Sequence, residues 1–458
     1  IRVQYIGYET FTSEELILSS VRPIDVKFAL SPGSIATEEI VVSATRNAFE
    51  PLNELSVVST RSFSAEETER IPAGVNDPGR VALSYPGVQR GQDDNENQIV
   101  VRGNSPVGVL WRLEGIDIPN PNHFAVIGSS GGGITVFSAQ LLAKSDFSTG
   151  GFSAEYGNAI SGAFDVHFRN GDMNKRVNKL RVGILGLDYS TEGPIKEGRS
   201  SYLVNYRYST LGLLSNLGFN LLGERVTNEF QDLSFNLVFN SKNSKSRFTI
   251  FGIGGLSEEH YLPVTNPEER DLTISNHSED RIRPANMGAI GTTWTYLPNK
   301  RSYFKAVVAL MASDITSNQD TLDLQNRPFR YQTEEYTDTR ISTSLTYQYQ
   351  LNEKSYLKTG IIANQIFFDF LKQSSPRRNI SDITQLQTST NVEGSGSTQM
   401  FQHYGLIHSD LTPKLSMNLG YHYLFLAANN TQSIEPRVSF QYQPKANQLT
   451  NDQFLNQI

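Results

Sequence analysis

The sequence predicts a mainly β protein whose larger part is an antiparallel, membrane-spanning β-barrel, preceded by a mixed α/β segment. Three observations favour this fold. Long stretches after about residue 180 alternate apolar and polar residues, the connections between them alternate in length, and the chain holds 20 Tyr and 25 Phe but only 5 Met among 458 residues. Because only every second residue of such a strand faces lipid, the low mean hydropathy of −0.36 is compatible with a barrel.

The alternation is clearest in the segments 233–239, 341–349 and 415–425, where apolar residues are separated by polar or small ones. A period of two gives a strand one apolar and one polar face. In a membrane barrel these faces meet lipid and lumen respectively. We count about eleven such strands between residues 180 and 443.

The connections between these strands are expected to be sorted by length. Short polar turns fall near 191–199, 241–246, 298–300, 351–354 and 412–414, and longer polar stretches near 213–230, 257–284, 317–335 and 372–397. An up-and-down membrane barrel has tight turns on one side and long loops on the other. A soluble β-rich binding protein, which is the alternative, gives no reason for this sorting.

Composition excludes several other classes of protein. The net charge is −7 with both signs interspersed, so nucleic acid is not an expected partner. Cysteine is absent, which excludes disulfides and thiolate metal sites. The longest apolar run, Ala306–Ala312, is far shorter than the ~20 residues of a membrane helix. The chain opens within a strand-like segment without an initiator Met or signal peptide, and we therefore expect a fragment.

No motif predicts catalysis, a cofactor or a metal ion. Residues Gly193–Ser200 approach a P-loop, but Arg199 replaces the phosphate-binding lysine and a strand pattern follows, so a turn is favoured. The seven histidines form no ligand cluster. The acidic run Asp93–Asn97 lacks the EF-hand glycine and is interpreted as a solvated loop rather than a calcium site. The glycines 131–133 could form an anion nest, although a flexible loop is favoured.

Three short motifs stand ahead of the strand-rich part: Val101-Arg102-Gly103, Glu114–Pro119 and Tyr156–Gly162. Together they resemble the plug domain of TonB-dependent outer-membrane receptors. The resemblance implies a gated importer of the Gram-negative cell outer membrane, not an enzyme. It also implies a multi-pass barrel of about 22 strands, of which this chain would hold roughly half.

The resemblance assigns roles to individual plug residues. The motif and the latch between plug and barrel are expected at Val101, Arg102, Gly103, Gly115, Asp117, Tyr156, Gly157 and Asn158. Arg102 is expected to be buried at the plug–barrel interface, where a guanidinium needs a carboxylate partner. The following segment is expected to approach the outer face, with ligand contact and simple solvation equally open for Asn120, Asn122, His123 and Phe124.

The same resemblance divides the chain into four parts. Residues 1–33 resemble the last strands of a carboxypeptidase-regulatory-like β-sandwich module, and residues 34–50 a linker that carries the TonB box at Glu39, Ile40, Val41, Val42, Ser43 and Ala44. A β-prone segment of this kind can add as an edge strand to a periplasmic partner. Residues 51–170 form the plug segment, and residues 171–458 the N-terminal part of the barrel.

The implied function is import of a ligand that is bound by outer loops and plug, with a TonB-like periplasmic protein as energy-coupling partner and outer-membrane lipids around the barrel. The ligand stays open among small molecules, glycans and peptides, because the Arg-Gly-Pro that usually precedes the Tyr-Gly motif in siderophore receptors is absent here. The alternative is an outer-membrane binding or assembly platform that works with a surface lipoprotein and transports nothing.

Overall fold

The chain forms two compact units, Ile1–Ala48 and Phe49–Ile458. The computed structural model describes residues 2–3, 11–12, 59–65, 68, 77–91, 98–183, 186–212, 225–243, 245–266, 268–270, 277–323, 325–375 and 389–442. In the first unit, β1 (Arg2–Val3) and β2 (Phe11–Thr12) pair antiparallel. The predicted TonB box and linker lie outside the described residues, as does most of the predicted N-terminal module.

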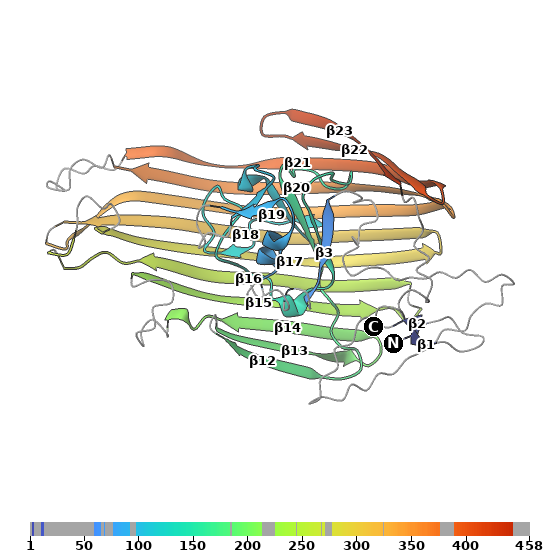
Figure 1. Ribbon diagram of the computed structural model, residues 1–458, viewed down its shortest axis with the longest axis horizontal. Coiled ribbons are helices and arrows are strands. Elements are labelled where there is room, and N and C mark those ends of the chain that lie inside the picture. Colours follow the sequence, from blue (N-terminus) through green and yellow to red (C-terminus); the bar gives the residue numbers. More distant parts are fainter. Residues whose placement is uncertain are drawn as a thin grey trace, which may run out of the picture. The chain divides into compact units, whose positions relative to one another are not determined.

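Twelve strands of the second unit form one antiparallel sheet in which chain order is also spatial order (Figure 1). Hairpins between consecutive strands produce this arrangement, with β12 and β23 at its two edges. The strands are β12 (Val177–Gly183), β13 (Gly186–Lys196), β14 (Ser200–Tyr208), β15 (Val226–Asn240), β16 (Ser246–Tyr261), β17 (Glu279–Asn299), β18 (Ser302–Leu322), β19 (Pro328–Asn352), β20 (Ser355–Ser374), β21 (Ser389–Thr412), β22 (Leu415–Leu426) and β23 (Thr431–Tyr442).

The sheet holds one strand more than the sequence pattern predicts. The expected first strand is in fact a hairpin, since β12 ends at Gly183 and β13 begins at Gly186. Apolar residues occupy even positions before the turn (Leu180, Val182) and odd positions after it (Leu187, Tyr189), and Val182 and Leu187 pair and are both exposed on the same face. Gly186 has a φ of 143°, a conformation that suits glycine at such a turn.

Several strands are longer than predicted, and the loop sorting is less strict. Long connections remain at 209–225, 262–278 and 375–388, but residues 323–327 and 427–430 connect their strands tightly. The expected polar stretch at 317–335 is mostly strand. Alternation fades there because both faces of the strand ends carry polar residues, although the ladder of hydrogen bonds continues.

The two faces of the sheet have different partners. We call the face that contacts the plug segment the inner face and the opposite one the outer face. The residues of the apolar run Ala306–Ala312 lie alternately on the two faces. Val308 and Leu310 are half exposed on the outer face, whereas Val307 and Met311 are buried in the core with the plug segment. This explains an apolar run without a membrane helix, and no helix in the described part of the chain is long and apolar enough to cross a membrane.

Aromatic side chains gather on the outer face near the short turns. Trp294 stacks on Tyr296 with ring centroids 5.7 Å apart, and Tyr347 stacks on Tyr349 two strands away. The Trp294 indole is 42% exposed. Rings placed in this way are typical of the membrane–water interface of a barrel.

The plug segment contains a mixed five-stranded sheet in the order β3-β10-β11-β6-β7, in which only β11 and β6 run parallel. Trp111 and Phe164 stack at its centre with ring centroids 4.0 Å apart. The plug elements are β3 (Thr60–Phe63), α2 (Pro78–Val81), η2 (Ala82–Ser84), β4 (Val88–Arg90), β5 (Ile99–Val101), η3 (Pro106–Gly108), β6 (Val109–Leu113), β7 (Ile116–Asp117), β8 (Asn122–His123), β9 (Ile134–Thr135), η4 (Ala139–Leu141), β10 (Ser145–Ser148) and β11 (Gly162–Val166).

Candidate functional site

The Val101-Arg102-Gly103 motif forms a tight turn after β5. Arg102 and Gly103 both have positive φ, of 51° and 75°, and Asn104 N donates to Val101 O across the turn. Two consecutive positive φ values define a type I′ turn, which favours glycine at the second position. Because Arg102 lies on the turn it is exposed, and it donates to Ser59 Oγ over 2.5 Å. In the described part of the chain Arg102 is thus exposed and bound to Ser59, and its burial against a carboxylate of another part of the barrel stays a prediction.

The Glu114–Gly115 pair forms a second tight turn, which joins β6 to β7. Both residues have positive φ, and Leu113 pairs with Ile116 directly beyond them. The turn directs the Glu114 carboxylate toward the end of β11, where it accepts a hydrogen bond of 2.8 Å from Phe168 N. The motif thus positions a carboxylate as well as reversing the chain.

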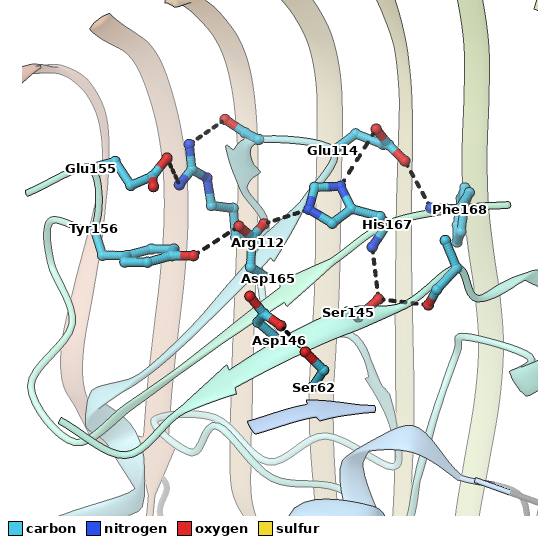
Figure 2. A network of polar contacts seen from close by, with 12 residues as sticks. Ser62, Arg112, Glu114, Ser145, Asp146, Glu155, Tyr156, Asp165, His167 and Phe168 are labelled. Carbon is cyan, nitrogen blue, oxygen red and sulfur yellow. Dashed lines mark hydrogen bonds and ion pairs between the residues drawn. The ribbon is translucent and has the colours of Figure 1, made fainter. Parts of the chain in front are cut away.

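A buried polar network starts from this turn, and Figure 2 shows its members side by side. Arg112 lies in β6, whose five residues are all buried, so its guanidinium requires a nearby carboxylate. Its Nη1 lies 3.6 Å from Glu155 Oε2, and its Nη2 donates to Gly115 O. Tyr156 donates from its hydroxyl to Asp165 Oδ2 over 2.9 Å. The Tyr156 of the motif is therefore one of the residues that fix this network.

His167 lies between two carboxylates in the same network (Figure 2). Its Nε2 is 3.5 Å from Asp165 Oδ1 and its Nδ1 is 3.8 Å from Glu114 Oε2. Burial disfavours the imidazolium, but the charge of Asp165 and the contacts with both carboxylates outweigh it and raise the pKa of His167 to about 10. Burial likewise opposes ionisation of Glu114, yet His167 and Lys305 lower its pKa to about 2. His167 is therefore charged at neutral pH.

The His167 network predicts how plug stability depends on pH. A raised histidine pKa stabilises the fold fully below pH 6.5, and this contribution is lost as the pH rises through about 10. A lowered glutamate pKa stabilises it fully above pH 4.5, and this contribution is lost as the pH falls through about 2. We expect His167→Gln to lower the free energy of unfolding most between pH 4.5 and 6.5, and less toward pH 10.

The measurement is urea unfolding of the plug at several pH values, followed by Trp111 fluorescence in a Trp294→Phe background. These are the two tryptophans of the chain, so this background reports on the plug alone. Because the His167 side chain is 31% exposed, solvent screening will reduce the effect. His260→Gln, at an imidazole of similar exposure paired with Asp280, is the control. An equal loss at pH 6 and pH 10 would contradict the assignment.

The network is attached to the inner face of the sheet by two lysines. Lys358 of β20 donates to Glu155 over 2.7 Å, and Lys305 of β18 lies 3.8 Å from Glu114. The charge of Lys358 helps keep the pKa of Glu155 low against the opposing effect of burial. These ion pairs connect the centre of the plug segment to strands far along the chain.

A second attachment joins the β8–β9 pair to β14 and β15. Asp232 is fully buried and accepts two hydrogen bonds of 2.9 Å from Arg207 Nε, while His123 Nε2 lies 3.0 Å from Asp232 Oδ2. Arg207 also donates to Thr135 O over 2.6 Å. Burial lowers the pKa of His123, so its imidazole is neutral beside the Arg207–Asp232 pair.

This attachment determines where the predicted ligand-contact residues lie. Asn122, His123 and Phe124 are buried, and Phe124 N donates to Ser257 Oγ of β16. Asn120 is partly exposed and donates to Ser129 O and Gly131 O. Ligand contact by these four residues stays a prediction, and for the buried three it requires movement of the loop that follows β8.

A third attachment involves the Tyr-Gly-Asn motif and β7. Gln402 Nε2 of β21 donates to Asp117 over 3.3 Å, and burial raises the pKa of that carboxyl. His422 Nδ1 of β22 lies 2.8 Å from Ala154 O. A Cβ atom on Gly157 would overlap with the His422 ring, so only glycine permits this close approach. Asn158, with a φ of 54°, continues the turn.

A cavity of about 400 Å³ lies between the network and the inner face of the sheet. Its lining includes Arg112, Glu155, Asp165 and His167 of the plug segment together with Lys305 and Lys358 of the sheet. Both lysines stand close to the short turns, at Asn299–Ser302 and Asn352–Ser355. The cavity therefore belongs to the short-turn end of the sheet.

Sequence reasoning missed most of the residues that attach the plug. Arg112 could have been found as a lone charge in the apolar strand VLWRL, since a buried guanidinium needs a partner. Asp232, Lys305 and Lys358 carry no such signal, because charged residues are ordinary on the lumen face of a barrel strand.

Comparison with known proteins identifies the plug and the fold. Residues 54–163 match the family model of the TonB-dependent Receptor Plug Domain, so this part of the chain is a plug domain of that family. The match lies within the predicted plug segment, while the other predicted domain boundaries stay predictions. A comparison with curated proteins found no match.

Solved structures of outer-membrane receptors share the fold. The siderophore receptor PirA from Acinetobacter baumannii has a TM-score of 0.59 at 13% identity, over 85% of this chain and 59% of that one. The outer membrane transporter YddB from Escherichia coli has 0.59 at 13%, over 87% and 61%. The ferric yersiniabactin uptake receptor FyuA from Yersinia pestis has 0.58 at 12%, over 85% and 63%.

The chain thus spans about 60% of the length of these structures. The predicted fold class, a mainly β chain with a transmembrane barrel sheet and an α/β plug, is confirmed. The family model and the similar structures belong to receptors and transporters, not to enzymes. From here on the twelve-stranded sheet is called the barrel sheet.

Proposed function

We propose that this protein imports a ligand across the bacterial outer membrane and is opened by a TonB-like periplasmic partner. The observation that carries the proposal is a plug domain fastened to the inner face of the barrel sheet by a buried ion pair and buried hydrogen bonds. Glu155 of the plug pairs with Lys358 of β20, while the Arg207–Asp232 pair of β14 and β15 holds Thr135 O and His123 of the plug. A plug fastened in this way blocks the passage along the inner face of the barrel sheet. A ligand can pass only if the plug moves, so an external source of work is required.

The lengths of the connections orient the protein. Short turns of such barrels face the periplasm and long connections face the outside. Ala125 and Ile127 pack against Ala285 and Ile315 toward the long connections, so the loop after β8 forms the outward apex of the plug. We propose that a small molecule, glycan or peptide binds between this apex and the long connections, with Asn120 as the accessible member of the predicted contact set.

The order of plug elements suggests how pulling would loosen it. Among the described residues β3 is the first plug strand after the predicted TonB box, and it lies at one edge of the plug sheet. It pairs with β10 through four residue pairs, reinforced by a 2.6 Å hydrogen bond from Ser62 to Asp146. An edge strand is hydrogen-bonded to a neighbouring strand on one side only. Separating β3 from the plug sheet therefore costs less free energy than separating β11, which has a neighbour on both sides.

The role of the predicted TonB box is tested by one substitution and one control. We expect Val42→Pro to abolish uptake while ligand binding persists, because proline removes a backbone donor and breaks strand addition to the partner. Val42→Ala keeps the donor and should retain uptake. The measurement is cell-associated label with a co-purified ligand as probe, beside binding to the purified receptor. Undiminished uptake with Val42→Pro and with deletion of Glu39–Ala44 would exclude the mechanism.

The alternative function is a binding or assembly platform that works with a surface lipoprotein. It shares the barrel and the outward ligand site but does not need the plug to open. Locking β3 to β10 with a disulfide between Arg61→Cys and Phe147→Cys, which are paired residues, separates the two functions. Import should stop in the oxidised variant and resume after reduction, whereas a platform would work in both states.

A further inference from the structure

The cavity at the short-turn end is lined by a guanidinium with two donors that have no acceptor in the described part of the chain. Arg112 is 4% exposed, and its Nε and Nη1 donate no hydrogen bond to any described residue. Lys305 Nζ has the Glu114 carboxylate at 3.8 Å, which is beyond hydrogen-bond distance. A buried guanidinium edge without an acceptor is unfavourable, because it has lost water and gained no partner.

The carboxylates of the cavity are already engaged. Glu155 accepts from Lys358 over 2.7 Å, and Asp165 accepts from Tyr156 over 2.9 Å with His167 on its other side. Asp146 accepts from Ser62 over 2.6 Å. Among the described residues, the buried lining atoms without a hydrogen-bond partner are the donors Arg112 Nε and Nη1 and one acceptor, Asp165 Oδ1, which faces the charged His167. The two guanidinium donors therefore point toward an acceptor-rich ligand.

We propose that this cavity is a binding site for the oxyanion of a small molecule, a carboxylate or a phosphate, on the periplasmic side of the plug. Arg112 supplies the positive charge and two N–H donors without a partner, Nε and Nη1, which favour an oxyanion as ligand. Lys305 supplies a second charge from the barrel wall. The volume of about 400 Å³ admits a small organic acid.

The site is separate from the outward ligand site proposed above. Ala125 of the apex packs against β17 and β18 near the long connections, whereas the cavity opens among residues next to the short turns. A ligand that passes the plug would meet this cavity last. The orientation rests on the proposed function, but binding to the cavity is measured without any uptake.

The test is isothermal titration of the full-length receptor in detergent, at low salt and neutral pH, with succinate and separately with inorganic phosphate. We expect saturable binding of one molecule per receptor for at least one of the two probes. Binding of succinate alone would indicate a carboxylate site, and binding of phosphate alone a phosphate site. Lys305→Gln should weaken it by about tenfold, the effect of losing one charge-assisted hydrogen bond.

The matched control is Lys372→Gln. Lys372 lies on the same strand as Lys358 and is paired with Glu334, but it stands at the long-connection end. The substitution Lys372→Gln should leave the affinity for succinate or phosphate unchanged. Arg112→Lys is a second test, since it keeps the charge and loses the planar fork, with Trp111 fluorescence as the check that the plug is folded. No saturable binding by the unmodified receptor, or equal affinity in Lys305→Gln, would overturn the proposal.

Discussion

Replacing Asp232 by alanine should loosen the plug from one side of the barrel sheet and lower its stability by about 1–3 kcal/mol, the effect of losing a buried hydrogen-bond partner. Asp232 is fully buried and holds both Arg207 of β14 and His123 of the plug. Its removal also takes the nearest counter-charge from Arg207, whose hydrogen bond to Thr135 O holds β9 of the plug. Urea unfolding followed by Trp111 fluorescence in the Trp294→Phe background measures the change.

The control for this prediction is Asp320→Ala. Asp320 also pairs with an arginine, Arg330, but these side chains are 24% and 44% exposed. An exposed pair of this kind contributes about 0–1 kcal/mol. A loosened plug should also raise the ion conductance of the receptor in planar bilayers for Asp232→Ala and not for the control. Equal effects of both substitutions on stability would show that Asp232 is no latch.

Gly157→Ala should destabilise the docked plug by about 1–3 kcal/mol, the cost of forcing extra volume into a packed interface. The added Cβ would overlap with the His422 ring and stand 2.5 Å from Gln402 Oε1. His422 has little freedom to retreat, because its Nδ1 is fixed to Ala154 O. The same fluorescence-detected unfolding measures the loss.

A double variant separates a steric effect from a general one. His422→Ala removes the ring that the new methyl group would meet, so Gly157→Ala should be much less harmful in that background. Gly254→Ala is the control in the barrel sheet, where the nearest atom to the added Cβ is Met287 O at 3.8 Å. Additive losses in the double variant would show that the close approach of Gly157 to His422 is not the cause.

The sequence predicted the faces of the strands because that information is local. A period of two places Leu345 and Tyr347 on one face whatever the rest of the chain does. Both are exposed on the outer face, as expected. The turn at Arg102–Gly103 was not predicted, although glycine at Gly103, as at Gly115, fits the positive φ that a two-residue turn needs.

The hairpin at Gly183–Gly186 was not predicted, although the apolar residues change there from even positions (Leu180, Val182) to odd ones (Leu187, Tyr189). The extended ends of β18 and β19 were missed because they lack alternation, although they still pair through Asp320 and Arg330. Hydropathy indicates a strand only where the two faces meet different surroundings. Where both meet water or both are covered, the pattern disappears.

By itself, the sequence determined the fold class, the plug motifs and the side of each strand that faces lipid. Only the tertiary structure decided which charges meet across the plug–barrel interface in the described part of the chain. Asp117 and Gln402 are 285 positions apart, and His123 and Asp232 are 109 apart. Such pairs depend on the register of every intervening hairpin, in which one shifted residue turns each side chain to the other face.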